Sequence, residues 1–88
     1  MTEREAQITN PLGLHARPAA QLVRTAAGFS SEVRLEKDGM EVNGKSIMGV
    51  MMLAAECGST VRIRADGVDE ADAVAAICAL ISDGFGES

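Results

Sequence analysis

Hydrophobic residues recur along this sequence with two different periods, which predict two kinds of element. Where apolar and polar residues alternate, a half-buried β-strand is indicated. In residues 32–37, Val33 and Leu35 lie on one face and charged residues on the other. The Asp38-Gly39 pair that follows is typical of a tight hairpin turn. The alternation predicts strands at residues 3–8, 32–37, 40–42 and 61–65.

Apolar residues spaced three and four positions apart predict helices between these strands. The first helix is expected from about His15 to Ala27, where its first turn tolerates Pro18 because an N–H there has no intrahelical partner. A short helix at 47–55 opens after Ser46, a favourable N-cap residue. The last helix, at 69–83, has an acidic first turn that complements its dipole. Its apolar stripe consists of Val74, Ile77, Cys78 and Ile81.

The resulting order is β-α-β-β-α-β-α, in which each strand has one apolar face. This pattern predicts an α+β fold, in which one face of a sheet is covered by helices. A chain of 88 residues is expected to form a single domain, residues 1–88. Because only two residues are aromatic, we expect a core of aliphatic side chains and Met.

The net charge of −5 and the absence of Trp and Tyr argue against a nucleic-acid-binding protein. The longest apolar run is too short to cross a membrane, and the N-terminus has no secretory signal, so we expect a cytoplasmic protein. Cys57 and Cys78 form no CxxC pair and are expected to be reduced, with Cys78 buried in its helical stripe.

The candidate chemistry centres on His15, the only histidine, in the segment GLHARPAA. A lone histidine at a helix start is commonly structural, and one imidazole does not hold a metal ion. However, an N-cap position places His15 beside the free N–H groups of the first turn, which favour anions and a neutral imidazole. Arg17 adds a forked cation suited to phosphate. This arrangement favours a transient phosphohistidine, with no metal ion or cofactor.

A second candidate region is NGKSIMGVMM, residues 43–52. Capping alone would explain Ser46, but a phosphate there would also meet the helix dipole favourably. On so short a helix, Val50 and Leu53 fit the core. Ile47, Met48 and Met51 would then be exposed as an adaptable apolar patch that suits several partners.

The segments NPLGLHARPAA and NGKSIMGVMML together resemble the HPr family, the histidine-containing phosphocarriers of the bacterial phosphoenolpyruvate-dependent phosphotransferase system. The likeness extends over essentially the whole chain. It implies an open-faced sandwich of four antiparallel strands with three helices on one face. It also implies a monomeric relay that is not itself an enzyme.

The resemblance assigns roles to particular residues. His15 would accept a phosphoryl group on Nδ1 from phosphorylated Enzyme I and pass it to an EIIA domain, with Arg17 assisting. Ser46 would match the serine that the HPr kinase/phosphorylase modifies. Ile47, Met48 and Met51 would match the apolar contact patch, and Arg24 would remain from the basic residues that help partners dock.

Other functions can be weighed against that of a sugar-transport phosphocarrier. The ending SDGFGES and the Met51-Met52 pair are similar to the nitrogen-related branch of the family, whose carrier feeds regulatory proteins. The segment KSIMGVM is equally similar to carriers that are controlled through the serine, so both branches stay open. The chain could instead act mainly as a binding module controlled through Ser46, although relatives that only bind lack the histidine. A ligand-sensing domain would leave Arg17 and the exposed Met residues unexplained.

Overall fold

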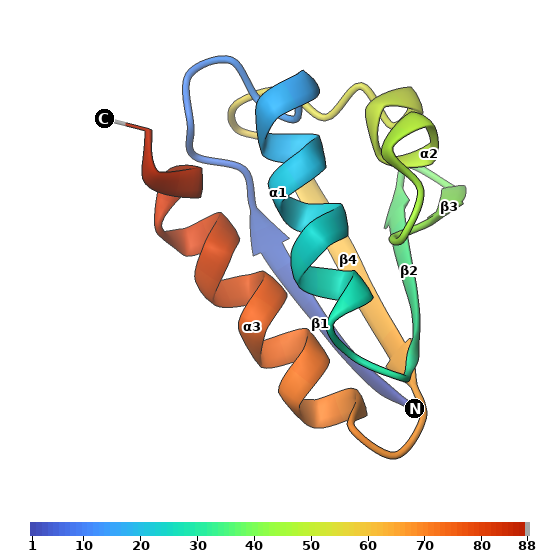
Figure 1. The fold of residues 1–88 in the computed structure, drawn as a ribbon. Helices are drawn as coiled ribbons and strands as arrows, with labels where there is room; N and C mark the ends of the chain where they lie inside the picture. Colours follow the sequence, from blue (N-terminus) through green and yellow to red (C-terminus); the bar gives the residue numbers. More distant parts are fainter. Residues whose placement is uncertain (88) are drawn as a thin grey trace.

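A computed structural model describes residues 1–87, in which four strands form one antiparallel sheet with the order β1-β4-β2-β3 (Figure 1). The pairing places Glu3 opposite Arg64, and Leu35 opposite both Ile63 and Val42. Each strand therefore contributes one apolar face to the same side of the sheet. The strands are β1 (Thr2–Gln7), β2 (Glu32–Lys37), β3 (Met40–Asn43) and β4 (Thr60–Asp66).

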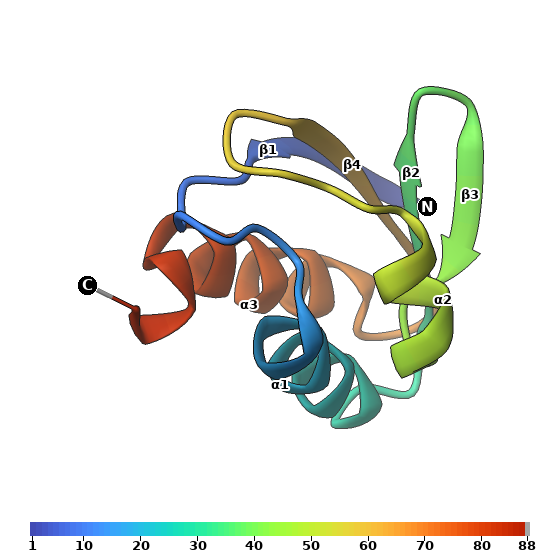
Figure 2. The same ribbon diagram turned by 90° about the horizontal axis from the view of Figure 1, so that it is seen from above.

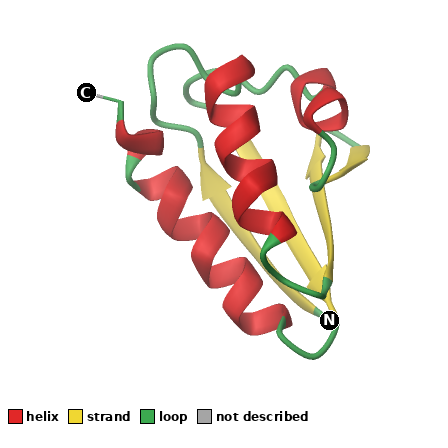
Figure 3. Ribbon diagram, viewed as in Figure 1, coloured by secondary structure: helices red, strands yellow, loops and turns green. Residues whose placement is uncertain are grey.

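Two long helices, α1 (Ala16–Ala27) and α3 (Glu70–Ser82), lie side by side on this apolar face (Figures 2 and 3). The short helix α2 (Ile47–Met52) packs against α1 near β3, and a 3-10 turn, η1 (Gly84–Gly86), follows α3. Because α1 and α3 run in opposite directions, the start of α1 and the end of α3 meet at one end of the molecule (Figure 1). The predicted fold class and element order are confirmed.

The core between the two layers is aliphatic, as the composition predicts, but the expected contribution of Met is wrong, because all five Met residues are exposed. Leu22 of α1, Ile63 of β4 and Ile77 of α3 are fully buried. Cys78 is also buried, in agreement with its place in the apolar stripe. Phe85, just after α3, is buried as well and closes one end of the core.

The predicted length of the second helix is wrong, whereas the other element boundaries agree within one residue. The helix ends at Met52 rather than at residue 55, and Ala54 takes the left-handed conformation with φ 51°. The chain leaves the helix because the carbonyl of Ala55 accepts a hydrogen bond from the Leu14 N–H at 2.9 Å. Pairing with another loop thus replaces the last helical turn.

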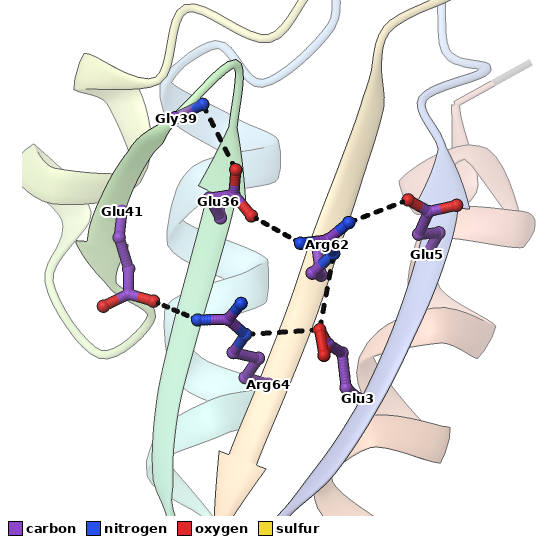
Figure 4. Close-up of polar contacts among 7 residues, drawn as sticks. All are labelled: Glu3, Glu5, Glu36, Gly39, Glu41, Arg62 and Arg64. Carbon is purple, nitrogen blue, oxygen red and sulfur yellow. Dashed lines mark hydrogen bonds and ion pairs between the residues drawn. The ribbon is translucent and has the colours of Figure 1, made fainter.

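The opposite face of the sheet is open and charged (Figure 4). Arg62 contacts Glu5 and Glu36, and its Nε lies 3.4 Å from Glu3. Arg64 bridges Glu3 and Glu41 at 3.3 and 2.8 Å. Exposed ion pairs contribute little stability individually, but they make this face a solvated one.

None of the helices within residues 1–87 combines the length and the apolar character that a membrane-spanning helix requires.

Candidate functional site

His15 is the N-cap residue of α1, as the sequence predicts. Its backbone is extended (φ −79°, ψ −173°), and its carbonyl accepts the first helical hydrogen bond, from Ala19 N–H at 2.9 Å. Within residues 1–87, no side chain caps the free N–H groups of this turn. The start of α1 therefore presents uncapped donors and the positive end of the helix dipole beside the imidazole.

The loop before α1 packs closely against the loop after α2, and this packing fixes the position of His15. Gly13 has φ 66°, and a Cβ there would lie 2.3 Å from the carbonyl oxygen of Ala55. Only glycine meets both demands. The next residue, Leu14, is buried and donates its N–H to the same Ala55 carbonyl. The backbone immediately before His15 is thus fixed from both sides.

The His15 side chain is 35% exposed, and its Nε2 lies 2.9 Å from Oε2 of Glu87. The other carboxylate oxygen, Oε1, accepts a hydrogen bond from Nδ2 of the buried Asn10 at 3.2 Å. These two hydrogen bonds, first from His15 and then from Asn10, lower the pKa of Glu87. Neither residue was predicted as part of the site. Glu87 is 72 positions from His15, and no spacing pattern connects the two.

Arg17 lines the same open cavity as His15, with a volume of about 570 Å³. Its side chain is exposed and forms no ion pair with any other residue among 1–87. Arg24 is also exposed and lies two turns further along α1 on nearly the same side. The remaining lining residues are Pro11, Leu12, Gln21, Phe85, Gly86 and Glu87.

The second candidate region forms a capped helix with an exposed apolar surface. The Oγ of Ser46 accepts a hydrogen bond from the Gly49 N–H at 3.1 Å, so the predicted cap is confirmed. Val50 and Leu53 are buried, as predicted. The α2 patch, defined as Ile47, Met48 and Met51, is 45%, 73% and 41% exposed.

The sequence prediction was incomplete for this surface. Met52 and Leu12 are 63% and 73% exposed, although neither was assigned to the patch. Leu12 lines the cavity of His15, and α2 packs against α1, so apolar side chains are exposed near both candidate regions.

Within residues 1–87, no group of three or more His, Cys, Asp or Glu side chains is arranged to hold a metal ion. What the site offers is an imidazole, a guanidinium that forms no ion pair with the described residues, and backbone donors around one open cavity. An open site that combines a nucleophile with anion donors suits reversible transfer of a phosphoryl group between proteins. The class of protein that fold and site define is therefore a small phosphoryl carrier.

Comparison with known proteins supports this class. The family model "PTS HPr component phosphorylation site" matches residues 2–83. The chain belongs to the HPr family, the phosphocarriers of the phosphotransferase system, which relay a phosphoryl group and are not enzymes.

Individual relatives match over nearly their whole length. Phosphocarrier protein HPr of Cupriavidus necator is 52% identical over 87 residues, which cover 99% of this chain and 98% of the relative. The HPr-like protein Crh of Halalkalibacterium halodurans is 47% identical, with coverage of 92% and 96%. The crystal structure of HPr from Thermoanaerobacter tengcongensis superposes with a TM-score of 0.97 at 49% identity, with coverage of 100% and 99%.

Proposed function

We propose that His15 is the residue that carries the phosphoryl group in this chain. It accepts the group on Nδ1 from phosphorylated Enzyme I, which is charged by phosphoenolpyruvate, and passes it to an EIIA domain. The observation that carries this assignment is the position of His15 at the uncapped start of α1, in one open cavity with Arg17. The proposed setting is the cytoplasm, with the protein acting as a monomer.

The surroundings of His15 suit a phosphoryl group in transit. The transition state spreads negative charge over the three equatorial oxygens of phosphorus, so positioned donors lower its free energy. The first-turn N–H groups of α1 supply fixed donors, and Arg17 supplies a planar fork that can bind two oxygens at once. Because the cavity is open, the corresponding site of a partner protein can approach the ring.

We further propose that the α2 patch, together with Arg24, docks the partner proteins. Ile47, Met48 and Met51 are exposed on a helix that packs against α1, so a partner seated there lies close to the helix that carries His15. Unbranched Met side chains adapt to differently shaped partners. The exposed guanidinium of Arg24 offers a cation to an acidic partner.

Ser46 is the proposed regulatory site. Phosphorylation by an HPr kinase/phosphorylase would place roughly two negative charges at the start of α2, directly before the patch. That charge suits the helix end but opposes the burial of the neighbouring apolar side chains against a partner.

Intact-protein mass spectrometry after incubation with phosphoenolpyruvate and catalytic Enzyme I tests the carrier assignment. Wild type should gain one phosphoryl group that is stable at alkaline pH and lost in acid. His15→Ala should gain none, while Ser46→Ala should be labelled like wild type. Labelling of His15→Ala would contradict the assignment.

A further inference from the structure

The C-terminal segment turns back over His15 through an unusual backbone. Gly84, Phe85 and Gly86 have φ values of 63°, 58° and 74°, so three consecutive residues are left-handed. Phe85 adopts this strained conformation while its ring is buried at 3% exposure. Backbone hydrogen bonds from Gly86 to Asp83 and from Glu87 to Gly84 close the turn. The turn brings the next side chain, Glu87, to the imidazole.

Both oxygens of Glu87 are engaged. Oε2 lies 2.9 Å from His15 Nε2, and Oε1 accepts a hydrogen bond from Asn10 Nδ2. The same Nδ2 also donates to the Gly13 carbonyl at 2.7 Å. Since both partners of Nδ2 are acceptors, the amide of Asn10 must present its NH₂ group to them. Asn10 therefore clamps the carboxylate to the backbone that precedes His15.

An ionised carboxylate only accepts hydrogen bonds, and the pKa of Glu87 is held below its usual value by its contacts with His15 and Asn10. Its partner Nε2 must therefore carry a hydrogen. In the neutral imidazole the other nitrogen, Nδ1, then holds the free lone pair. The contact thus selects the tautomer that can attack phosphorus through Nδ1.

We propose that Glu87, clamped by Asn10, is a positioning residue for phosphoryl transfer, which keeps the proton on Nε2 and leaves Nδ1 free as the nucleophile. This inference rests on the proposed role of His15. The Glu87 carboxylate would also stabilise the phosphorylated form, because the ring becomes positively charged once Nδ1 is phosphorylated.

The bonds and charges balance without any proton transfer. The Nδ1 lone pair forms the bond to phosphorus, and the bond from phosphorus to the donor's leaving atom breaks with its electron pair staying on the donor. The proton remains on Nε2, and the cationic ring faces the Glu87 carboxylate. In onward transfer, the electron pair of the N–P bond returns to Nδ1, and the neutral tautomer is regenerated.

Because His15 is the only histidine, nitrogen NMR of the ring reports the tautomer without overlap. At a pH where the ring is neutral, wild type should show nearly pure Nε2–H. Glu87→Ala and Asn10→Ala should shift the ring toward a mixture of tautomers. Phosphoryl acceptance from Enzyme I should slow about 10-fold or more in Glu87→Ala, as for other residues that orient a functional histidine.

Asp83→Asn is the matched control, because it removes an equal charge from an exposed side chain four positions away. It should behave like wild type in both measurements, and thermal unfolding confirms that all variants are folded. An unchanged rate and tautomer in Glu87→Ala would overturn the proposal. Slower phosphoryl acceptance with an unchanged tautomer would mean that Glu87 only compensates the charge of the phosphorylated ring. That result would also overturn the proposed positioning role. Failure of wild type to be labelled would instead reject the role of His15.

Discussion

At His15, two charged environments of opposite sign meet on one imidazole ring. The start of α1 and Arg17 favour an anion next to the ring, whereas the carboxylate of Glu87 lies against Nε2. The two do not cancel, because they act on different atoms. In the proposed roles, the donors bind phosphoryl oxygens, while Glu87 accepts the hydrogen bond from Nε2. This separation would let one side chain act as a nucleophile on one edge and as a fixed hydrogen-bond donor on the other.

Substitutions of Arg17 and Arg24 can distinguish a role in phosphoryl transfer from a role in binding Enzyme I. Only Arg17 lines the cavity of His15, although both side chains are exposed on the same helix. Arg17→Ala should slow phosphoryl transfer by about 10²-fold, the typical effect of losing one transition-state donor. Its affinity for Enzyme I should change little. Rapid-quench transfer kinetics and titration calorimetry measure the two effects separately.

Arg24→Ala is the matched variant, and the opposite pattern is expected. Its transfer rate at saturating Enzyme I should equal that of wild type, while its affinity should fall, and more so at low salt. If Arg17→Ala changed only the affinity, the assignment of Arg17 to the phosphoryl group would be wrong.

Helix α2 is short and begins at a capping serine, Ser46. Six residues are too few for a stable isolated helix, so α2 depends on the Ser46 hydrogen bond and on the burial of Val50. Its exposed side is apolar. The residue that starts the helix therefore also lies at the border of the α2 patch.

Two substitutions at Ser46 separate capping from regulation. Ser46→Ala removes the acceptor for Gly49 N–H and should lower the free energy of unfolding by about 1 kcal/mol, with Enzyme I affinity unchanged. Ser46→Asp keeps a good cap and should leave stability near wild type. Its charge beside the patch should weaken Enzyme I binding roughly tenfold. Urea unfolding and calorimetry test both, and equal affinities for the two variants would leave Ser46 as a cap only.

The elements and part of the candidate site could be predicted because their signals are local. His15, Arg17 and Ser46 lie at helix starts, where capping and dipole rules apply to neighbouring residues. Glu87 could not be predicted, since it reaches His15 only through the left-handed turn at Phe85. The predicted end of α2 was wrong for a similar reason, because a hydrogen bond between the Leu14 N–H and the Ala55 carbonyl determines where the helix ends. What sequence patterns lack are contacts between segments that the fold brings together.

The two faces of the molecule differ in whether their arginines are paired with acids. On the open face, Arg62 and Arg64 pair with acids of the neighbouring strands (Figure 4). By contrast, Arg17 and Arg24 on α1 have no acidic partner among residues 1–87. A net charge of −5 thus coexists with two exposed cations on α1, the helix that begins at His15. The exposed cations of α1 can therefore steer an acidic partner electrostatically even though the protein as a whole is acidic.

One acidic residue connects the two main helices through their ends. Asp69 is the N-cap residue of α3, but its carboxylate forms no capping hydrogen bond with its own helix. It accepts hydrogen bonds from the N–H groups of Ser30 and Ser31 at 2.9 Å and from the hydroxyls of both. The turn between α1 and β2 is thereby attached to the start of α3.

This attachment predicts how stability depends on pH. The Ser31 hydroxyl, then the backbone N–H of Ser30, lower the pKa of Asp69 from 3.8 to about 2. Because the folded pKa is below the unfolded one, the contribution to stability is complete above about pH 4. It is lost as pH falls toward 2, since the unfolded chain then binds the proton more readily. The midpoint of urea unfolding should therefore fall across this range.

Asp69→Asn should be less stable than wild type at neutral pH, and its urea midpoint should decline less between pH 4 and 2. Part of the decline should remain, because the pKa of Glu70 is also lowered to about 2, chiefly by the Thr2 hydroxyl. Asp72→Asn, three residues further along α3, removes the same charge and should keep the wild-type decline. Parallel curves for wild type and Asp69→Asn would show that the Asp69 carboxylate does not hold the two segments together. A shallower curve would assign that role to a residue 39 positions from the loop that it binds.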